Sequence, residues 1–234
     1  MFTETAELYD RFYAWKDYDA EAARLREMIA AAGGPGAGTL LDVACGTGTH
    51  LRALGAHYTG EGMDLDAGLL AAARERLPTV PLHQGDMRDF DLGRTYDVVT
   101  CLFSSIGYTR TVEGMTSAIR VMARHVAPSG VLAVEPWFAP GVYRAGTIGV
   151  NTVEEPGLTL VRMVVSRVEG SVSILDFEYL IGRPDGITRA SERHELGLFT
   201  PAQTRAAFDA AGLRVTHDEH GLTGRGLYIG FRPA

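Results

Sequence analysis

The sequence has few cysteines, no long apolar run and no excess of positive charge, and each absence excludes a class of protein. Two cysteines, Cys45 and Cys101, cannot build a disulfide framework, so we expect a reducing, cytoplasmic setting. No apolar run approaches the roughly 20 residues that cross a bilayer, and the acidic N-terminus lacks the apolar core of a signal peptide. The formal net charge of -7 argues against a nucleic-acid partner, which needs a basic face.

What remains is the composition of an ordinary globular protein of 234 residues. Hydrophobic residues make up 46% of the chain, enough to bury a substantial core without staples. The 28 glycines follow no repeat period, which excludes collagen-like and low-complexity chains. The length predicts one large domain, or one domain that carries an insertion.

Residues 1–140 alternate between helical and strand patterns. Apolar residues recur at spacings of three and four from Ala22 to Ala32 and from Val112 to Val126, which predicts two helices with apolar faces. We expect Pro128-Ser129-Gly130 to end the second. Other runs predict a helix over 67–76 and strands near 39–44, 58–65, 80–83, 96–103 and 130–135. This alternation predicts an α/β fold whose parallel sheet is covered on both faces.

Residues 141–198 have a different pattern, with β-branched stretches near 159–165, 172–181 and 187–198 and turn signals between them. We predict an antiparallel β insertion that forms a cap or a dimer surface. Residues 199–234 return to the first domain. Thr200, Pro201 and Gln203 predict a capped helix that Gly212 closes, followed by strands near 213–217 and 226–231.

A glycine turn follows the first predicted strand, with Ala44, Gly46 and Gly48 between strand and helix. Glycines let a backbone approach a ligand, and the next helix offers free N–H groups. A P-loop would need a lysine after the last glycine, and Thr49 stands there. A dinucleotide turn would need a third glycine where Leu51 stands, which weakens that interpretation without removing it. The third possibility is a nucleoside cofactor with an amino-acid tail.

Acidic residues follow the second and third predicted strands. Asp64 can accept hydrogen bonds from both hydroxyls of a ribose, although Asp64 or Asp66 could instead cap the next helix. Asp66 is the better placed cap, and Asp64 the better placed ribose ligand. Asp86 and Met87 offer a carboxylate and an apolar wall to an adenine. Because the carboxyl ends of parallel strands share one edge, these residues and the glycine turn predict one cofactor crevice.

At these residues the chain resembles a class I S-adenosylmethionine (SAM)-dependent methyltransferase. More narrowly, it is similar to bacterial TDP-amino-sugar N,N-dimethyltransferases of the desosamine and mycaminose type. The resemblance spans nearly the whole chain. The matching stretches are Ala6-Glu7-Leu8-Tyr9-Asp10, Lys16-Asp17-Tyr18, 40–51, 85–90, 99–107 including Phe-Ser-Ser-Ile-Gly, Val134-Glu135-Pro136-Trp137 and Gly224-Arg225-Gly226-Leu227.

The resemblance implies a seven-stranded mixed sheet with an antiparallel last strand, and a small antiparallel sheet inserted after the fifth strand. It also implies a homodimer, SAM as the cofactor and a TDP-amino sugar as the substrate. Tyr18 matches a tyrosine that binds the methionine tail of the cofactor, and Arg225 an arginine that contacts the nucleotide sugar. We place Leu65 and Leu102 beside the cofactor and Phe103 beside the substrate.

One position departs from the family. A histidine usually follows Ser-Ser-Ile-Gly, near the reacting amine, and here Tyr108 stands there. The amine must be neutral to attack, and a histidine suits the role of base. A tyrosine, with an ordinary pKa of about 10, is a poor base but can orient the amine. We expect Tyr108 to position the amine while water takes the proton. The alternative is a packing tyrosine.

Arg225, between two glycines, can engage phosphate oxygens bidentately, although a surface arginine is the commoner case. Trp137 could stack on sugar or base, or belong to the core. Tyr9 and Tyr13 lie four positions apart on an N-terminal helix, where they could form a lid or that helix's buried face.

The histidines show no metal-ligand spacing, so we expect no metal. The two cysteines are expected to be small buried residues beside the cofactor. Three other functions remain open: methylation of another small acceptor, cofactor binding without catalysis, and NAD-dependent oxidation.

Overall fold

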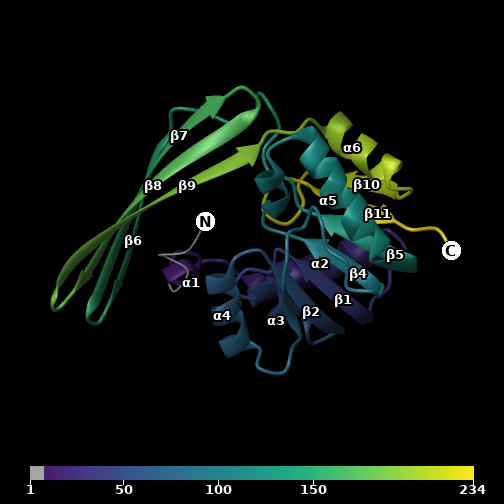
Figure 1. Ribbon diagram of the computed structural model, residues 1–234, viewed down its shortest axis with the longest axis horizontal. Coiled ribbons are helices and arrows are strands. Elements are labelled where there is room, and N and C mark those ends of the chain that lie inside the picture. Colours follow the sequence, from purple (N-terminus) through teal and green to yellow (C-terminus); the bar gives the residue numbers. More distant parts are fainter. Residues whose placement is uncertain (1–7) are drawn as a thin grey trace.

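The computed structural model describes residues 8–234, which form two separate sheets (Figure 1). The N-terminal residues 1–7 lie outside this description, and with them Ala6 and Glu7 of the matched N-terminal stretch. The large sheet has seven strands in the order β10-β11-β5-β4-β1-β2-β3. Its strands are β1 (Gly38–Val43), β2 (Tyr58–Asp64), β3 (Leu82–Gln84), β4 (Tyr96–Cys101), β5 (Val126–Val134), β10 (Arg214–Asp218) and β11 (Leu227–Phe231).

Strands β1 to β5 run parallel, and β11 is antiparallel to both of its neighbours. The expected mixed sheet is therefore confirmed. The described helices are α1 (Tyr9–Phe12), α2 (Tyr18–Ala31), α3 (Thr49–Leu54), α4 (Ala67–Arg76), the 3-10 helix η2 (Ser105–Thr109), α5 (Val112–Arg124) and α6 (Pro201–Ala210). The helix predicted over 67–76 is confirmed at both ends.

Successive buried residues of the central strands pack on opposite faces of the sheet. Leu40 of β1 and Val98 of β4 contact the apolar side of α2 and α3. Leu41 and Val99, one position further on, contact α5 and α6 instead. Both faces of the sheet are thus covered, which explains why these strands are near-continuous apolar runs.

The predicted end of the helix that begins at Val112 is wrong. Helix α5 already ends at Arg124, and the Pro128-Ser129-Gly130 segment lies inside β5. The pairing of β4 with β5 shifts register between Tyr96 and Val98, and Ser129 takes a left-handed φ of 64°. The segment is therefore a β-bulge, in which extra residues loop out while pairing resumes beyond them.

The insertion is a four-stranded antiparallel sheet made of β6 (Ile148–Glu155), β7 (Leu158–Glu169), β8 (Val172–Arg183) and β9 (Gly186–Gly197). It follows β5, as expected, and its turns at 170 and 186 use glycines with positive φ. Strand β6 lies outside the three stretches that the sequence predicts as strands. In Figure 1 this sheet arches away from the large sheet, and α1 lies on the side that faces the core.

The inner face of the insertion packs against α1 and against Leu8, the residue before it, through buried apolar side chains. Leu8 and Phe12 form a cluster with Leu160, Tyr179 and Ile181 of the insertion.

Among residues 8–234, no helix is long and apolar enough to cross a membrane.

Helix α6 returns the chain to the large sheet, and its predicted cap is confirmed. The Thr200 hydroxyl accepts a hydrogen bond from the Gln203 N–H, and the Gln203 side chain accepts one from the Thr200 N–H. This reciprocal pair satisfies two donors that a helix start leaves open.

Candidate active site

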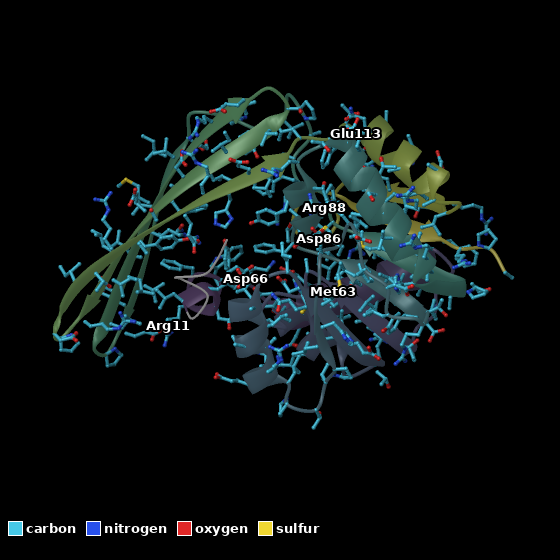
Figure 2. All side chains as sticks on the ribbon, viewed as in Figure 1. Arg11, Met63, Asp66, Asp86, Arg88 and Glu113 are labelled. Carbon is cyan, nitrogen blue, oxygen red and sulfur yellow. The ribbon has the colours of Figure 1, made fainter. Side chains whose placement is uncertain are left out.

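A cavity of about 1090 Å³ lies between the carboxyl edge of the large sheet and the inner face of the insertion. Its walls come from α1, the turns after β1 to β5, η2, and strands β7 to β9. Figure 2 places Asp66, Asp86 and Arg88 in this space between the two sheets. This volume is slightly above the usual range of about 300–1,000 Å³ for ligand sites, which suits two ligands side by side.

The glycine turn forms one wall of the cavity. Ala44, Gly46 and Gly48 all have positive φ, at 59°, 57° and 77°. Ala44 and Gly46 line the cavity, and a Cβ built on Gly46 would meet no atom within 4 Å. Gly48 instead faces α4, where a Cβ would lie 2.9 Å from Leu77 Cδ1. The turn therefore presents bare backbone to open space, which is a cradle for a ligand.

Asp64 and Asp66 make different contacts, and the predicted helix cap at Asp66 is confirmed. Asp66 Oδ1 accepts hydrogen bonds from the N–H groups of Gly68 and Leu69, at 2.9 and 3.1 Å, so it caps α4. The Asp64 carboxylate accepts from Gly46 N at 2.8 Å and from Asp66 N at 2.9 Å. Burial raises the pKa of Asp64 above its ordinary value. Asp64 lines the cavity with acceptor capacity left over.

Asp86 and Met87, the residues predicted to border an adenine, line the cavity, and so does Leu65, which is predicted to lie beside the cofactor. Asp86 is paired with Arg88, whose Nε lies 2.9 Å from Asp86 Oδ1. Hydrogen bonds from Arg88 lower the pKa of Asp86, so this carboxylate is ionised.

Two residues predicted to bind the cofactor lie behind the cavity wall. Tyr18 is the first residue of α2 and contacts the His50 ring edge-on, with 4.7 Å between ring centroids. Leu102 is buried among the apolar residues between β4 and α2. Neither belongs to the cavity lining as the structure has it.

Helix α1 closes the cavity from the side of the insertion. Tyr9 of α1 and Tyr13, directly after the helix, both line the cavity with 4.6 Å between their ring centroids, while Phe12 forms the buried face. Asp10 of the same helix accepts hydrogen bonds from the Thr47 hydroxyl and from Arg76, each at 2.6 Å. These bonds tie α1 to the glycine turn, so the two tyrosines form part of the wall.

The substrate candidates gather on the opposite wall. Phe103 and Ser104, which precede η2, both have positive φ. The Phe103 N–H donates to Glu135 at 2.7 Å, and Glu135 is completely buried. Arg225 Nη2 lies 3.7 Å from the same carboxylate, and its guanidinium lies over the rings of Phe103 and Trp137. Glu135 thus holds the aromatic wall and the arginine together.

Sequence reasoning missed Arg162 of β7. It is 8% exposed and lines the cavity, where its guanidinium lies 4.5 Å from the centre of the Phe12 ring. Its Nη2 donates to Asn151 at 3.1 Å, and its Nε has no hydrogen-bond acceptor within the described part of the chain. A buried cation without a carboxylate partner favours an anionic ligand. The isolated sequence gave no signal for it, because one arginine in a strand is usually exposed.

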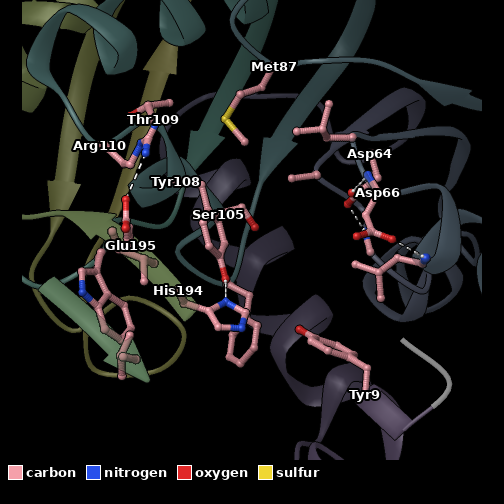
Figure 3. A pocket seen from close by; sticks show the side chains of 18 of the residues that line it. Tyr9, Asp64, Asp66, Met87, Ser105, Tyr108, Thr109, Arg110, His194 and Glu195 are labelled. Atoms are coloured by element: carbon pink, nitrogen blue, oxygen red, sulfur yellow. Dashed lines mark hydrogen bonds and ion pairs between the residues drawn. The ribbon is translucent and has the colours of Figure 1, made fainter. Parts of the chain in front are cut away.

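Tyr108 of η2 points into the cavity, and its hydroxyl lies 2.7 Å from His194 Nδ1 of β9 (Figure 3). Burial raises the pKa of Tyr108 well above its ordinary value. Tyr108 is therefore a wall residue and not a surface tyrosine. His194 is one of the histidines for which the sequence shows no metal-ligand spacing. No group of three or more potential metal ligands occurs within residues 8–234.

Comparisons with known proteins give this geometry a family. Residues 40–130 match the family model described as a methyltransferase domain. The chain is 46% identical, over 97% of its length and 90% of the other, to a dTDP-3-amino-3,6-dideoxy-alpha-D-glucopyranose N,N-dimethyltransferase of Streptomyces fradiae. It is 41% identical to the solved structure of Streptomyces venezuelae DesVI, with a TM-score of 0.92 and 99% of both chains covered.

A second solved structure is similar and was determined with SAM bound. It is CalS10, an amino pentose methyltransferase of Micromonospora echinaspora. It is 41% identical, with a TM-score of 0.86, and 99% of this chain and 98% of that chain are covered.

Proposed function

The chain belongs to the family of bacterial SAM-dependent amino-sugar N,N-dimethyltransferases, and we propose that it dimethylates the amino group of a TDP-linked 3- or 4-amino deoxysugar. One observation carries this proposal. A single cavity brings the glycine turn and Asp64 together with Tyr108, Trp137 and Arg225, so a cofactor and an acceptor can meet in it.

The cofactor half of the cavity fits S-adenosylmethionine. The bare backbone of Gly46 would receive the amino-acid tail, Asp64 would accept from the ribose hydroxyls, and Asp86 and Met87 would border the adenine. Tyr18 lies behind the cavity wall, where the segment that joins α1 to α2 ends. From there it would support the methionine tail of the cofactor indirectly, through that segment. The cofactor supplies a methyl group that its sulfonium already activates, so the chain's task is alignment of the acceptor.

The acceptor half fits a nucleoside diphosphate sugar. Arg225 and Arg162 would meet the phosphates from two sides of the cavity, which suits an acidic protein that handles an anion. Trp137 is held by its Nε1–H, which donates to Ser173 at 2.8 Å, and would present its face to the sugar or base together with Phe103. Tyr9 would close the sugar pocket from α1. Tyr108 would hold the amine by its hydroxyl, because its raised pKa keeps the phenol protonated.

The outer face of the insertion supports a homodimer. Ile148 and Val150 of β6 pair with Val165 and Met163 of β7, and all four are exposed together with Leu180 of β8. This patch lies on the face of the sheet opposite the cluster with α1. Exposed apolar patches of this kind mark association surfaces.

The two buried free cysteines support a cytoplasmic location.

The experiment is incubation of the purified protein with SAM and a panel of TDP-3-amino and TDP-4-amino deoxysugars, followed by mass spectrometry. We expect one acceptor to gain about 28 mass units in two equal steps. Each step replaces one hydrogen of the amine with a methyl group. The same sugars with a hydroxyl in place of the amine are the control and should stay unmodified. If no amino sugar gains a methyl group while S-adenosylhomocysteine binds, the substrate assignment is wrong.

A further inference from the structure

Tyr108 is the first member of a hydrogen-bonded chain that leads from the cavity into the insertion. The Tyr108 hydroxyl lies 2.7 Å from His194 Nδ1, and His194 Nε2 lies 3.3 Å from Glu192 Oε2. Glu192 Oε2 also accepts from the Tyr179 hydroxyl at 3.0 Å. Figure 3 shows the Tyr108 side chain from η2 and the His194 ring from β9 pointing toward each other.

The environment of His194 holds the ring in one orientation. Its side chain is 5% exposed and that of Glu192 is 4% exposed. The two residues are separated by one position on β9, so they share the inner face of the sheet. The Phe177 ring of β8 contacts His194 edge-on at 5.1 Å between centroids. A ring packed in this way loses little freedom when it takes part in a reaction.

The partners also determine which nitrogen carries the proton. Glu192 Oε2 is a carboxylate oxygen that already accepts from the Tyr179 hydroxyl, so in its contact with His194 the ring donates through Nε2. Nδ1 is then the acceptor, and the Tyr108 hydroxyl must donate to it. The order carboxylate, imidazole, hydroxyl is the arrangement by which a catalytic triad takes a proton from a hydroxyl group.

We propose that His194 receives the proton that the substrate amine must lose, with Tyr108 as the group that passes it on. The ammonium N–H bond breaks as an O–H bond forms at Tyr108. In the same step the original Tyr108 O–H bond breaks and an N–H bond forms at His194 Nδ1. Glu192 offsets the positive charge of the resulting imidazolium, and the neutral amine keeps its electron pair for attack on the methyl carbon. Each of the two methylations needs one such transfer.

This inference rests on the proposed function, because it needs an amine as the acceptor. In this inference the proton goes to His194 of the insertion, whereas the sequence predicts that water takes it. The insertion would then contribute a residue to the reaction as well as a wall of the cavity. His194 is a positioning residue, since it acts on the amine through Tyr108. It also supplies an imidazole next to Tyr108, where the resemblance implies a histidine in the family.

Several other titratable groups surround the pair and bear on its pH dependence. Tyr179 comes from β8, Tyr9 from α1 and Tyr13 from the position directly after α1. Asp64 acts on Tyr108 from across the cavity. From β7 comes the cation of Arg162, which lies 5.2 Å from the centre of the Phe177 ring. None of these groups stands between Tyr108 and His194, which are in direct contact.

The test compares wild type with His194→Asn and Glu192→Gln, and uses His217→Asn as a matched control. His217 packs face to face on Tyr228 at 4.0 Å, outside the cavity. At pH 7 we expect His194→Asn to lower kcat by about 100-fold, the lower range for loss of a general base, with the KM for SAM unchanged. Glu192→Gln should give a smaller loss in kcat, and the control should be near wild type.

Two further readouts separate proton transfer from a structural role. The loss in His194→Asn should shrink as pH rises toward 9.5, where more of the amine is already neutral, and added imidazole should restore part of the rate. Wild-type kcat in His194→Asn at every pH would overturn the inference. So would a loss in both variants that neither pH nor imidazole changes. If wild type itself methylates no amino sugar, the proposed function fails instead.

Discussion

The Asp64 carboxylate accepts a hydrogen bond from the Gly46 backbone N–H at 2.8 Å, so the end of β2 fixes the turn that follows β1. The two residues lie 18 positions apart, but parallel neighbouring strands bring them to one edge. One side chain therefore shapes the proposed cradle for the cofactor tail and borders the proposed ribose site. The two functions cannot be changed independently.

Asp64→Asn should raise the KM for SAM by about tenfold, or about 1.4 kcal/mol, with little change in KM for the acceptor. The amide keeps one acceptor oxygen but loses the charge and the second acceptor. Asp66→Asn is the matched control, because asparagine caps a helix as well as aspartate does. Steady-state kinetics check this expectation. Equal effects of the two substitutions would contradict the division of roles.

Arg225→Lys should raise the KM for the nucleotide sugar by about tenfold and leave the KM for SAM near wild type. Lysine keeps the charge beside buried Glu135 but lacks the planar fork that meets two phosphate oxygens. Arg214→Lys, on the exposed side of β10, is the control. If Arg225→Lys changes only the KM for SAM, the arginine does not serve the acceptor.

Asp42→Asn should stabilise the protein at neutral pH and not in acid. Burial raises the pKa of Asp42 from its ordinary 3.8 to about 6. Between these values the folded protein holds a proton that the unfolded chain has lost, so wild-type stability falls as pH rises through this window. Above pH 6 the buried charge costs about 1–3 kcal/mol, and the amide removes that cost.

Urea unfolding of both proteins from pH 4 to 8 measures the difference. The two curves should meet near pH 4 and diverge up to about pH 6. A variant that is less stable than wild type at pH 8 would show that the hydrogen bond from Thr100, at 2.7 Å, outweighs burial of the charge.

Thr200→Ala should destabilise the protein by about 1 kcal/mol, the usual loss for a helix cap. Thr200→Ser keeps the hydroxyl and should behave like wild type. Because the Thr200 and Gln203 bonds form one box, the double substitution of both to alanine should cost less than the sum of the single ones. Thermal unfolding measures all four variants, and additive losses would contradict a coupled cap.

Met163→Lys should shift the proposed dimer to monomer by placing a charge in the exposed patch on the insertion. Arg189→Lys, on the same sheet beside Glu178, preserves its charge and should leave the dimer intact. Light scattering after size-exclusion chromatography gives the mass directly. A wild-type protein that is monomeric at micromolar concentration would contradict the dimer.

Local patterns determined much of the fold before any tertiary contact was known. The helix from Ala67 to Arg76 follows from Asp66 as its cap and from Pro78 beyond its end, and the capping box at Thr200 is likewise complete within four residues. Both depend on hydrogen bonds between near neighbours, which the sequence alone specifies. The matched motifs also specified the family.

Tertiary structure decided the rest, because it depends on residues that are distant in sequence. Pro128-Ser129-Gly130 has the composition of a helix terminator, yet pairing with β4 makes it a bulge. Arg162 is an ordinary strand arginine until α1 covers it. Tyr108 and His194 are 86 positions apart, and only the packing of β9 on η2 brings hydroxyl and imidazole together. The sequence by itself shows a tyrosine at position 108, and only the fold places the imidazole of a residue from the other sheet against its hydroxyl.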